Sequence, residues 1–165
     1  ESNMNLVMAV ERATLVPTPE DDAIELWVTQ AIETANRSLS PSPELSIRIT
    51  DTDEAAQFNE TYRAKAGATN VLSFPASPPP ETHSGLLGDL VICAPLVIEE
   101  AQTQDKQATA HWAHLVMHGV LHLLGYDHQT AAEAEAMELL EISALARLGY
   151  ANPYDIQTPL GSPQA

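Results

Sequence analysis

The chain has 165 residues, of which 44% are apolar, and its 7 basic and 23 acidic side chains give a net charge of −16. This length fits one domain, and the apolar share is ordinary for a globular protein. So large an acidic excess argues against broad contact with nucleic-acid phosphates. We therefore expect no DNA partner, and any RNA contact must use a local basic patch, a metal ion or a delivering partner. No apolar run approaches the length of a membrane span, so we expect no membrane association.

The single cysteine, Cys93, excludes an internal disulfide and fits a reducing compartment. It follows an apolar run, which predicts a small buried side chain rather than a reactive thiol. We recognise no secretory signal and expect a cytoplasmic protein. Residues 1–3 precede Met4 and are either native or a remnant of cloning, so we leave them out of the fold prediction.

The N-terminal part of the chain predicts a strand, a helix and a second strand. Residues 5–10 form an apolar run typical of a strand buried on both faces. A helix is expected to begin with Thr18 as N-cap and Pro19 at the first helical position. Its core-facing stripe comprises Ile24, Trp27, Val28, Ala31, Ile32 and Ala35. Residues 45–50 alternate apolar and polar side chains, which predicts a strand buried on one side and parallel to the first.

The remaining elements complete an α+β fold. We expect a helix over residues 51–65, strands over 69–74 and 86–93, and helices over 95–104, 108–124 and 131–148. The loop between the third and fourth strands is short, so these two strands should be antiparallel. The prediction is a single domain over residues 5–150, with a mixed four-stranded sheet, one antiparallel edge and about five flanking helices. Prolines in residues 151–165 predict a poorly ordered tail.

Three histidines, His118, His122 and His128, are the strongest functional pattern in the chain. The first two are four residues apart, so on a helix their Cβ atoms lie about 5–6 Å apart on one face. Both imidazoles can then reach one ion at about 2.0–2.1 Å. Gly125 is expected to end the helix in the left-handed conformation, so the chain can turn back and bring in His128. Three histidine ligands leave the fourth tetrahedral position to water, as in catalytic zinc sites.

Other ligand sets include His111 and His114, which lie near the same helix face. His114, His118 and His122 span about 12 Å along a helix axis, too far for one ion. The third ligand must therefore come from outside the helix, and we expect no direct metal role for His111 or His114. The alternative for the triad is that buried histidines only form hydrogen bonds between helices, but the spacing favours a metal site.

The spacing matches the zinc-protease pattern H-E-x-x-H-x-x-G-x-x-H at His118, His122, Gly125 and His128. Gly119, however, occupies the position of the glutamate general base, so peptide hydrolysis by that mechanism is not expected. A glycine inside a helix costs about 1 kcal/mol relative to alanine. We interpret Gly119 as leaving space beside the ion for a bulky substrate group such as a phosphodiester.

The chain resembles the YbeY family of bacterial metal-dependent endoribonucleases in more than the histidine motif. The similar segments are residues 58–63, 69–75, 88–92, 111–114 and 135–138, in order along roughly residues 5–154. The resemblance implies a zincin-like site that holds one zinc ion per chain through His118, His122 and His128, with Arg63 as the functional arginine. It also implies cytoplasmic cleavage of single-stranded RNA in ribosomal RNA processing, notably at the small-subunit 3′ end, and in ribosome quality control.

The resemblance further implies partners, namely the ribosome, ribosomal proteins and an Era-type GTPase, which would help an acidic chain meet RNA. In the expected metal-assisted cleavage, Arg63 stabilises transition-state charge, because its planar fork suits phosphate oxygens better than lysine does. The alternative for Arg63 is a surface ion pair with Glu60. Asp127 would either orient a ligand imidazole or cap the last helix.

Two other functions stay open from the sequence. A metal-dependent hydrolase of peptides or other small substrates would need a carboxylate from elsewhere in place of the missing glutamate. A non-catalytic ribosome-assembly factor with structural zinc would need a fourth protein ligand, and Asp127 is the nearest candidate.

Overall fold

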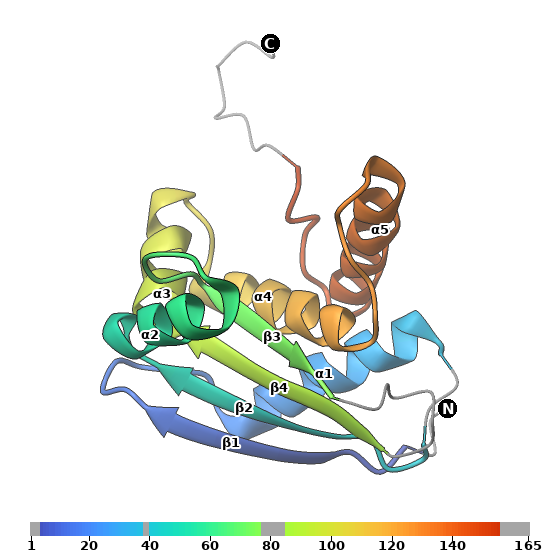
Figure 1. The fold of residues 1–165 in the computed structure, drawn as a ribbon. Helices are drawn as coiled ribbons and strands as arrows, with labels where there is room; N and C mark the ends of the chain where they lie inside the picture. Colours follow the sequence, from blue (N-terminus) through green and yellow to red (C-terminus); the bar gives the residue numbers. More distant parts are fainter. Residues whose placement is uncertain (1–3, 38–39, 77–84, 156–165) are drawn as a thin grey trace, which may run out of the picture.

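The computed structural model describes residues 4–37, 40–76 and 85–155. In this part of the chain, four strands and five helices form an α+β domain, which confirms the predicted fold class (Figure 1). The elements are β1 (Val7–Ala13), α1 (Asp21–Ala35), β2 (Glu44–Thr50), α2 (Thr52–Arg63), β3 (Val71–Pro75), β4 (Leu86–Cys93), α3 (Ala94–Thr103), α4 (Ala108–Leu123) and α5 (Ala131–Arg147).

The sheet has the strand order β1-β2-β4-β3. Strands β1, β2 and β4 are parallel, and β3 pairs antiparallel with β4 at the edge, as predicted. The register places Ser73 of β3 opposite Leu90, and Phe74 opposite Asp89. Because side chains alternate along a strand, neighbouring residues of β3 point to opposite faces of the sheet.

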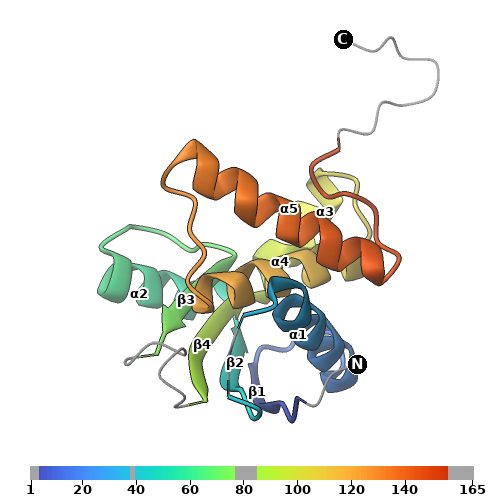
Figure 2. The ribbon, with the colours of Figure 1, turned by 90° about the vertical axis from the view of Figure 1, so that its right-hand side faces the viewer.

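Helices α1 and α4 lie side by side against one face of the sheet, and α5 packs outside them (Figures 1 and 2). Leu45, Ile47 and Ile49 point into this layer and are almost fully buried, which confirms the predicted one-sided burial of β2. The opposite face carries Ser46 and Arg48 and is covered in part by α2. This face of the sheet is therefore only half-covered.

The predicted burial of the first strand on both faces is wrong. Strand β1 pairs only with β2 at the edge of the sheet, and its residues alternate between exposed and half-buried positions. Val7, for example, is 47% exposed. An apolar run of this length occurs in both edge and central strands, so composition alone did not distinguish them.

The predicted N-terminus of the first helix is also wrong. Helix α1 begins at Asp21 with Glu20 as N-cap, and Thr18 does not cap it. The Thr18 hydroxyl instead accepts a hydrogen bond from Nε of Arg12 at 2.8 Å, and Arg12 also pairs with Asp21 at 2.7 Å. These contacts with β1 hold the segment before α1 outside the helix.

Cys93 is fully buried at the end of β4, and burial raises the pKa of its thiol. Residues 151–155 return to the domain, where Lys106 Nζ donates to the Pro153 carbonyl at 3.3 Å, whereas residues 1–3 and 156–165 lie outside the described residues. None of the helices in the described ranges is both long and apolar enough to cross a bilayer.

Candidate metal centre

The C-terminus of α4 positions the third histidine. The Gly125 amide donates to the His122 carbonyl at 3.0 Å, and the Tyr126 amide donates to the Leu121 carbonyl at 3.1 Å. These two bonds form a Schellman motif, in which Gly125 adopts φ +102°. The predicted helix-ending role of Gly125 is therefore confirmed, and the reversal carries the chain back toward the last turns of α4.

His118, His122 and His128 converge on one point. One ring nitrogen from each lies within 4.8 Å of the other two, so the three could hold a metal ion. The ring centroids of His122 and His128 are 5.0 Å apart, and those of His118 and His128 are 5.8 Å apart. His118 and His122 are half-buried, whereas His128 is exposed on the loop after α4.

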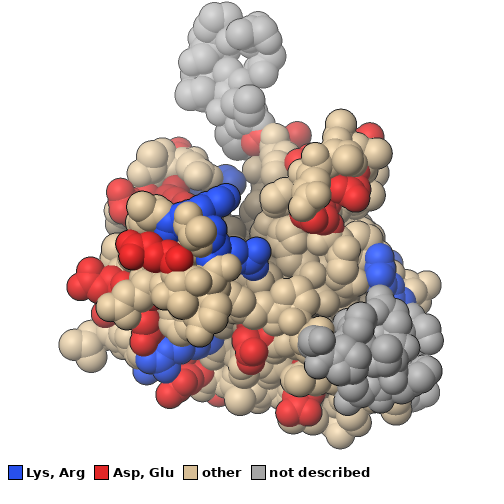
Figure 3. All heavy atoms as spheres, in the orientation of Figure 1, with Lys and Arg blue, Asp and Glu red and all other residues tan. Residues whose placement is uncertain are grey.

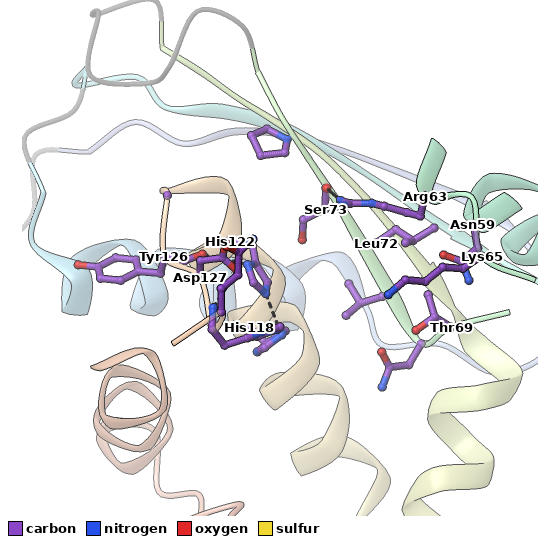
Figure 4. A pocket seen from close by; sticks show the side chains of 16 residues that line it. Asn59, Arg63, Lys65, Thr69, Leu72, Ser73, His118, His122, Tyr126 and Asp127 are labelled. Carbon is purple, nitrogen blue, oxygen red and sulfur yellow. Dashed lines mark hydrogen bonds between the residues drawn. The ribbon is translucent and has the colours of Figure 1, made fainter. Parts of the chain in front are cut away.

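The approach of His118 to His122 is itself an indication of a shared cation. Their Nε2 atoms lie 3.2 Å apart, joined by the dashed line in Figure 4. Nδ1 of each ring already faces an acceptor, Glu141 for His118 and the Tyr126 carbonyl for His122. In the neutral tautomer that donates from Nδ1, neither Nε2 carries a hydrogen, so two lone pairs face each other. Two nitrogens bound tetrahedrally at 2.0–2.1 Å would be about 3.3 Å apart, which fits the observed distance.

Burial keeps the imidazole of His122 in the form that a metal requires. Desolvation lowers the pKa of His122, and the neighbouring His118 and His128 lower it further. A neutral ring with a free Nε2 lone pair is therefore favoured at neutral pH. The Tyr126 carbonyl, 2.9 Å from Nδ1, holds this ring in orientation.

A carboxylate that the sequence did not identify supports His118 from behind. Glu141 of α5 is fully buried, and its Oε2 lies 2.5 Å from Nδ1 of His118. Its other oxygen lies 2.8 Å from Nε2 of His114 and accepts the Tyr154 hydroxyl. Burial would raise the pKa of Glu141, but the hydrogen bonds from His114 and His118 outweigh it and lower the pKa to about 2. Glu141 is therefore an ionised carboxylate that orients a candidate metal ligand.

A pattern in the sequence could have indicated Glu141. It lies on the buried stripe of α5 together with Met137, Ala144 and Leu145. A carboxylate on a core-facing stripe requires a partner. Helical periodicity within α5 does not identify the partner of Glu141, because His118 lies on another helix, α4.

Two further histidines of α4, His111 and His114, have partners of their own. His111 is buried, with Nε2 2.9 Å from Oε1 of Glu100, and desolvation lowers its pKa. His114 contacts Glu141 as described above. Neither belongs to the group of converging nitrogens.

The triad opens into a pocket of 730 Å³ that also receives Arg63 and Lys65. Figure 4 shows His118 and His122 on one wall and the two basic side chains on the opposite wall, with Ser73 between them. Arg63 donates a hydrogen bond to the Ser73 carbonyl, so the guanidinium is held against β3. Figure 3 shows basic side chains gathered over the α2 side of the molecule beside a hollow. Arg63 and Lys65 therefore form a local basic patch that faces the histidines, whereas Arg48 lines a different hollow.

The interpretation of Gly119 as space for substrate is wrong. Gly119 is buried and faces the sheet, where an added Cβ would lie 2.9 Å from Leu90 Cδ2 and 3.3 Å from Val71 Cγ2. Its carbonyl accepts the Ser73 hydroxyl at 3.2 Å. The absence of a side chain at Gly119 lets α4 approach β3 and β4 closely. A glycine at this position is therefore explained by the packing of the helix on the sheet and not by space for a substrate in the pocket.

The helix-capping alternative for Asp127 is also wrong. Thr130 is the N-cap of α5 and forms a capping box with Glu133. Asp127 instead accepts the amide of His128 at 2.7 Å and lines the pocket. The acceptors that face Nδ1 of the two α4 histidines come from Glu141 and Tyr126.

The chain is similar to known proteins in sequence and in fold. The model of the family described as "Endoribonuclease YbeY" matches residues 11–149. A protein of that name from Cellvibrio japonicus is 53% identical over 137 residues, which cover 83% of this chain and 76% of the relative. One from Methylococcus capsulatus is 50% identical over 147 residues, which cover 89% and 94% of the two chains. One from Pseudomonas putida is 52% identical over 150 residues, which cover 90% and 93%. A solution structure from Thermotoga maritima shares the fold, with a TM-score of 0.56 and 18% identity over 90% of this chain and 99% of that one.

Proposed function

This chain belongs to the YbeY family, and on that basis we propose that it is a zinc-dependent endoribonuclease that cleaves single-stranded RNA. His118, His122 and His128 would hold one zinc ion per chain, and Arg63 would act on the substrate phosphate. The observation that carries the proposal is the convergence of three imidazole nitrogens in a pocket that Arg63 also lines.

The donor set suits zinc. Three neutral imidazoles are a common zinc ligand set, and the separation of the two Nε2 atoms matches tetrahedral geometry. When bound, zinc would supply Lewis-acid polarisation of a phosphate oxygen and a lowered pKa for bound water. Glu141 and the Tyr126 carbonyl would fix the tautomer and orientation of two ligand rings.

Arg63 is the group in this pocket best suited to a phosphate in the transition state. Its planar guanidinium can donate two parallel hydrogen bonds to phosphate oxygens. The described contacts give Arg63 a hydrogen bond to the Ser73 carbonyl rather than an ion pair with Glu60, and this bond fixes one end of the fork. Lys65 on the same wall adds positive charge for the RNA backbone.

The other two functions have less support. Glu141 is buried behind His118, so it is not placed to activate water at the open side of a metal. Glu141 therefore does not replace the glutamate that this mechanism of peptide hydrolysis needs. Among the described residues, the group that could hold a metal comprises three histidines and does not include Asp127. Three protein ligands would leave the fourth position to water, which favours a catalytic ion over a structural one.

We further propose that the substrate is ribosomal RNA, with small-subunit 3′-end maturation and ribosome quality control as the processes served. Ribosomal proteins and an Era-type GTPase would be partners that deliver the RNA to an acidic chain, in the cytoplasm. The catalytic domain would span residues 5–150, beyond which Tyr154 contributes its contact with Glu141. The single buried cysteine is compatible with a reducing compartment.

The test combines metal analysis with an RNA cleavage assay. Purified wild-type protein should contain about one zinc per chain and cleave unpaired ribosomal RNA segments, and metal-stripped protein should not. His118→Ala should lower bound metal to background, and Arg63→Ala should retain metal but lose cleavage, which controls for contaminating ribonuclease. Full metal retention in His118→Ala, or equal cleavage by all samples, would refute the proposal.

A further inference from the structure

Three aromatic rings form a cluster on the other side of β3 from the histidines. Phe58 and Tyr62 of α2 are stacked, with centroids 5.9 Å apart and an interplanar angle of 24°. Phe74 of β3 meets Tyr62 edge-on at 5.4 Å and lies 6.3 Å from Phe58. Phe58 and Phe74 are half-buried, but Tyr62 is 62% exposed. Tyr62 therefore packs against both phenylalanine rings and still exposes most of its surface to solvent, where a further flat group can meet it.

The rings border a hollow of 410 Å³ on the half-covered face of the sheet. Its other walls include Arg48 and the carboxylates of Glu11 and Asp89. Arg48 is already paired with Glu11 and Glu54, both at 2.7 Å. The uncompensated charge in the hollow is therefore negative, which repels a phosphate but not an uncharged aromatic ring.

Arg63 connects this hollow to the metal pocket. It follows Tyr62 in the chain and lines the pocket of the three histidines. Its guanidinium carbon lies 5.6 Å from the Phe74 ring centroid, and the same group donates to the Ser73 carbonyl. Ser73 lines the metal pocket and Phe74 lines the hollow, and because neighbouring side chains of a strand point to opposite faces, β3 lies between the two.

The two hollows together match the two chemical parts of a nucleotide. Arg63 and Lys65 provide positive charge for the backbone beside the metal pocket. The exposed Tyr62 ring provides an uncharged stacking surface next to them, where carboxylates exclude phosphate. Single-stranded RNA is bound in this way, with bases stacked on aromatic rings while cationic side chains follow the backbone.

We propose that Tyr62, backed by Phe58 and Phe74, is a stacking site for one unpaired base of the RNA, adjacent to the nucleotide at the metal pocket. This inference rests on the proposed endoribonuclease function and extends it to how the substrate is selected. A base within a duplex is stacked on its neighbours and not free to stack on Tyr62, so the site favours single-stranded RNA. Every base has a π-face, so the site discriminates little between sequences.

Binding of a short, unpaired, fluorescently labelled RNA tests the proposal. Anisotropy titrations with metal-stripped protein, which should not cleave, compare wild type with Tyr62→Phe, Tyr62→Leu and Tyr62→Ala. Loss of the ring in the leucine and alanine variants should weaken binding by about 5- to 100-fold, whereas phenylalanine should retain it. Leucine preserves apolar packing on Phe58 and Phe74, so it separates stacking from folding. Leu139→Ala on α5, where the side chain is 58% exposed, is the matched control.

Abasic substitutions in the RNA locate the stacked base. One abasic position should weaken binding to wild type, and the same substitution should have little further effect on Tyr62→Leu, because the two changes remove one contact. Tyr62→Trp gives a direct readout, since a stacked base should quench its fluorescence. Trp27 and Trp112, which are 1% and 3% exposed, should contribute little to this change.

The outcomes separate this inference from the proposed function. If wild type cleaves RNA and the RNA affinity of Tyr62→Leu and Tyr62→Ala is unchanged, the stacking site is overturned while the proposed function stands. Equal abasic losses in wild type and Tyr62→Leu would also overturn it. A wild-type protein that neither binds nor cleaves RNA would refute the proposed function and this inference together.

Discussion

Oε2 of Glu141 and Nδ1 of His118 lie 2.5 Å apart, which links a fully buried carboxylate of α5 to the histidine face of α4. Nε2 of the same ring faces His122 and the pocket. A carboxylate that accepts the Nδ1 hydrogen of a histidine fixes the tautomer in which Nε2 has a free lone pair. It also makes Nε2 a stronger metal ligand. The packing of two helices therefore prepares a site whose ligands lie on one of them and on the loop that follows it.

Glu141→Gln should weaken metal binding by about 10- to 100-fold, as is typical for loss of a charged outer partner of a ligand histidine. The glutamine keeps a similar shape but removes the negative charge behind His118. Competition with a chromophoric chelator measures the zinc affinity directly. Glu138→Gln, an exposed position on the same helix, should leave the affinity unchanged. Equal affinities of wild type and Glu141→Gln would contradict an orienting role.

The pKa of Glu141 predicts how stability depends on pH. This pKa is lowered to about 2, below the ordinary glutamate value of about 4.3. The unfolded chain therefore takes up this proton before the folded protein does. The stabilisation from the ionised group is fully present above about pH 5 and declines as the pH falls toward 2. In urea titrations of metal-free protein, the stability difference between wild type and Glu141→Gln should shrink over that range. A difference independent of pH would contradict the prediction.

Arg63→Lys should slow RNA cleavage by about 100-fold, comparable to removal of one donor that stabilises transition-state charge. RNA affinity should change much less, because lysine keeps the positive charge but lacks the planar fork. Single-turnover cleavage and equilibrium binding of the same RNA separate the two effects. Lys65→Arg on the same pocket wall should change neither strongly. Equal losses in cleavage and binding for Arg63→Lys would mean that Arg63 only binds RNA.

Gly119→Ala should lower the free energy of unfolding by about 1 kcal/mol. The new methyl group would lie 2.9 Å from Leu90 Cδ2 in a buried contact. Overpacking costs about 1–3 kcal/mol, and replacing a mid-helix glycine by alanine regains about 1 kcal/mol. Leu90→Val shortens the opposing side chain, so the double variant should lose less stability than the sum of the two single variants. Denaturant unfolding of the three variants measures these changes. Undiminished stability of Gly119→Ala would show that the helix has room to move.

The convergence of the histidine triad was predictable from residues 118–128 because all of its causes are local. The helical repeat places His118 and His122 on one face, and the left-handed glycine at Gly125 reverses the chain. The bounds of β4 were also predictable, since a long apolar run before a helix is typical of a central strand. Local patterns of this kind act over a few residues and depend little on the rest of the fold.

Contacts between distant elements were decided only in the tertiary structure. Periodicity showed that one face of α4 is buried, but not that Gly119 meets Leu90 or that Glu141 stands behind His118. It likewise placed Arg63 at the end of α2 without showing that β3 holds it in the histidine pocket. The physical reason is that a sequence pattern identifies which face of an element is buried, whereas the atoms opposite that face depend on how the elements pack.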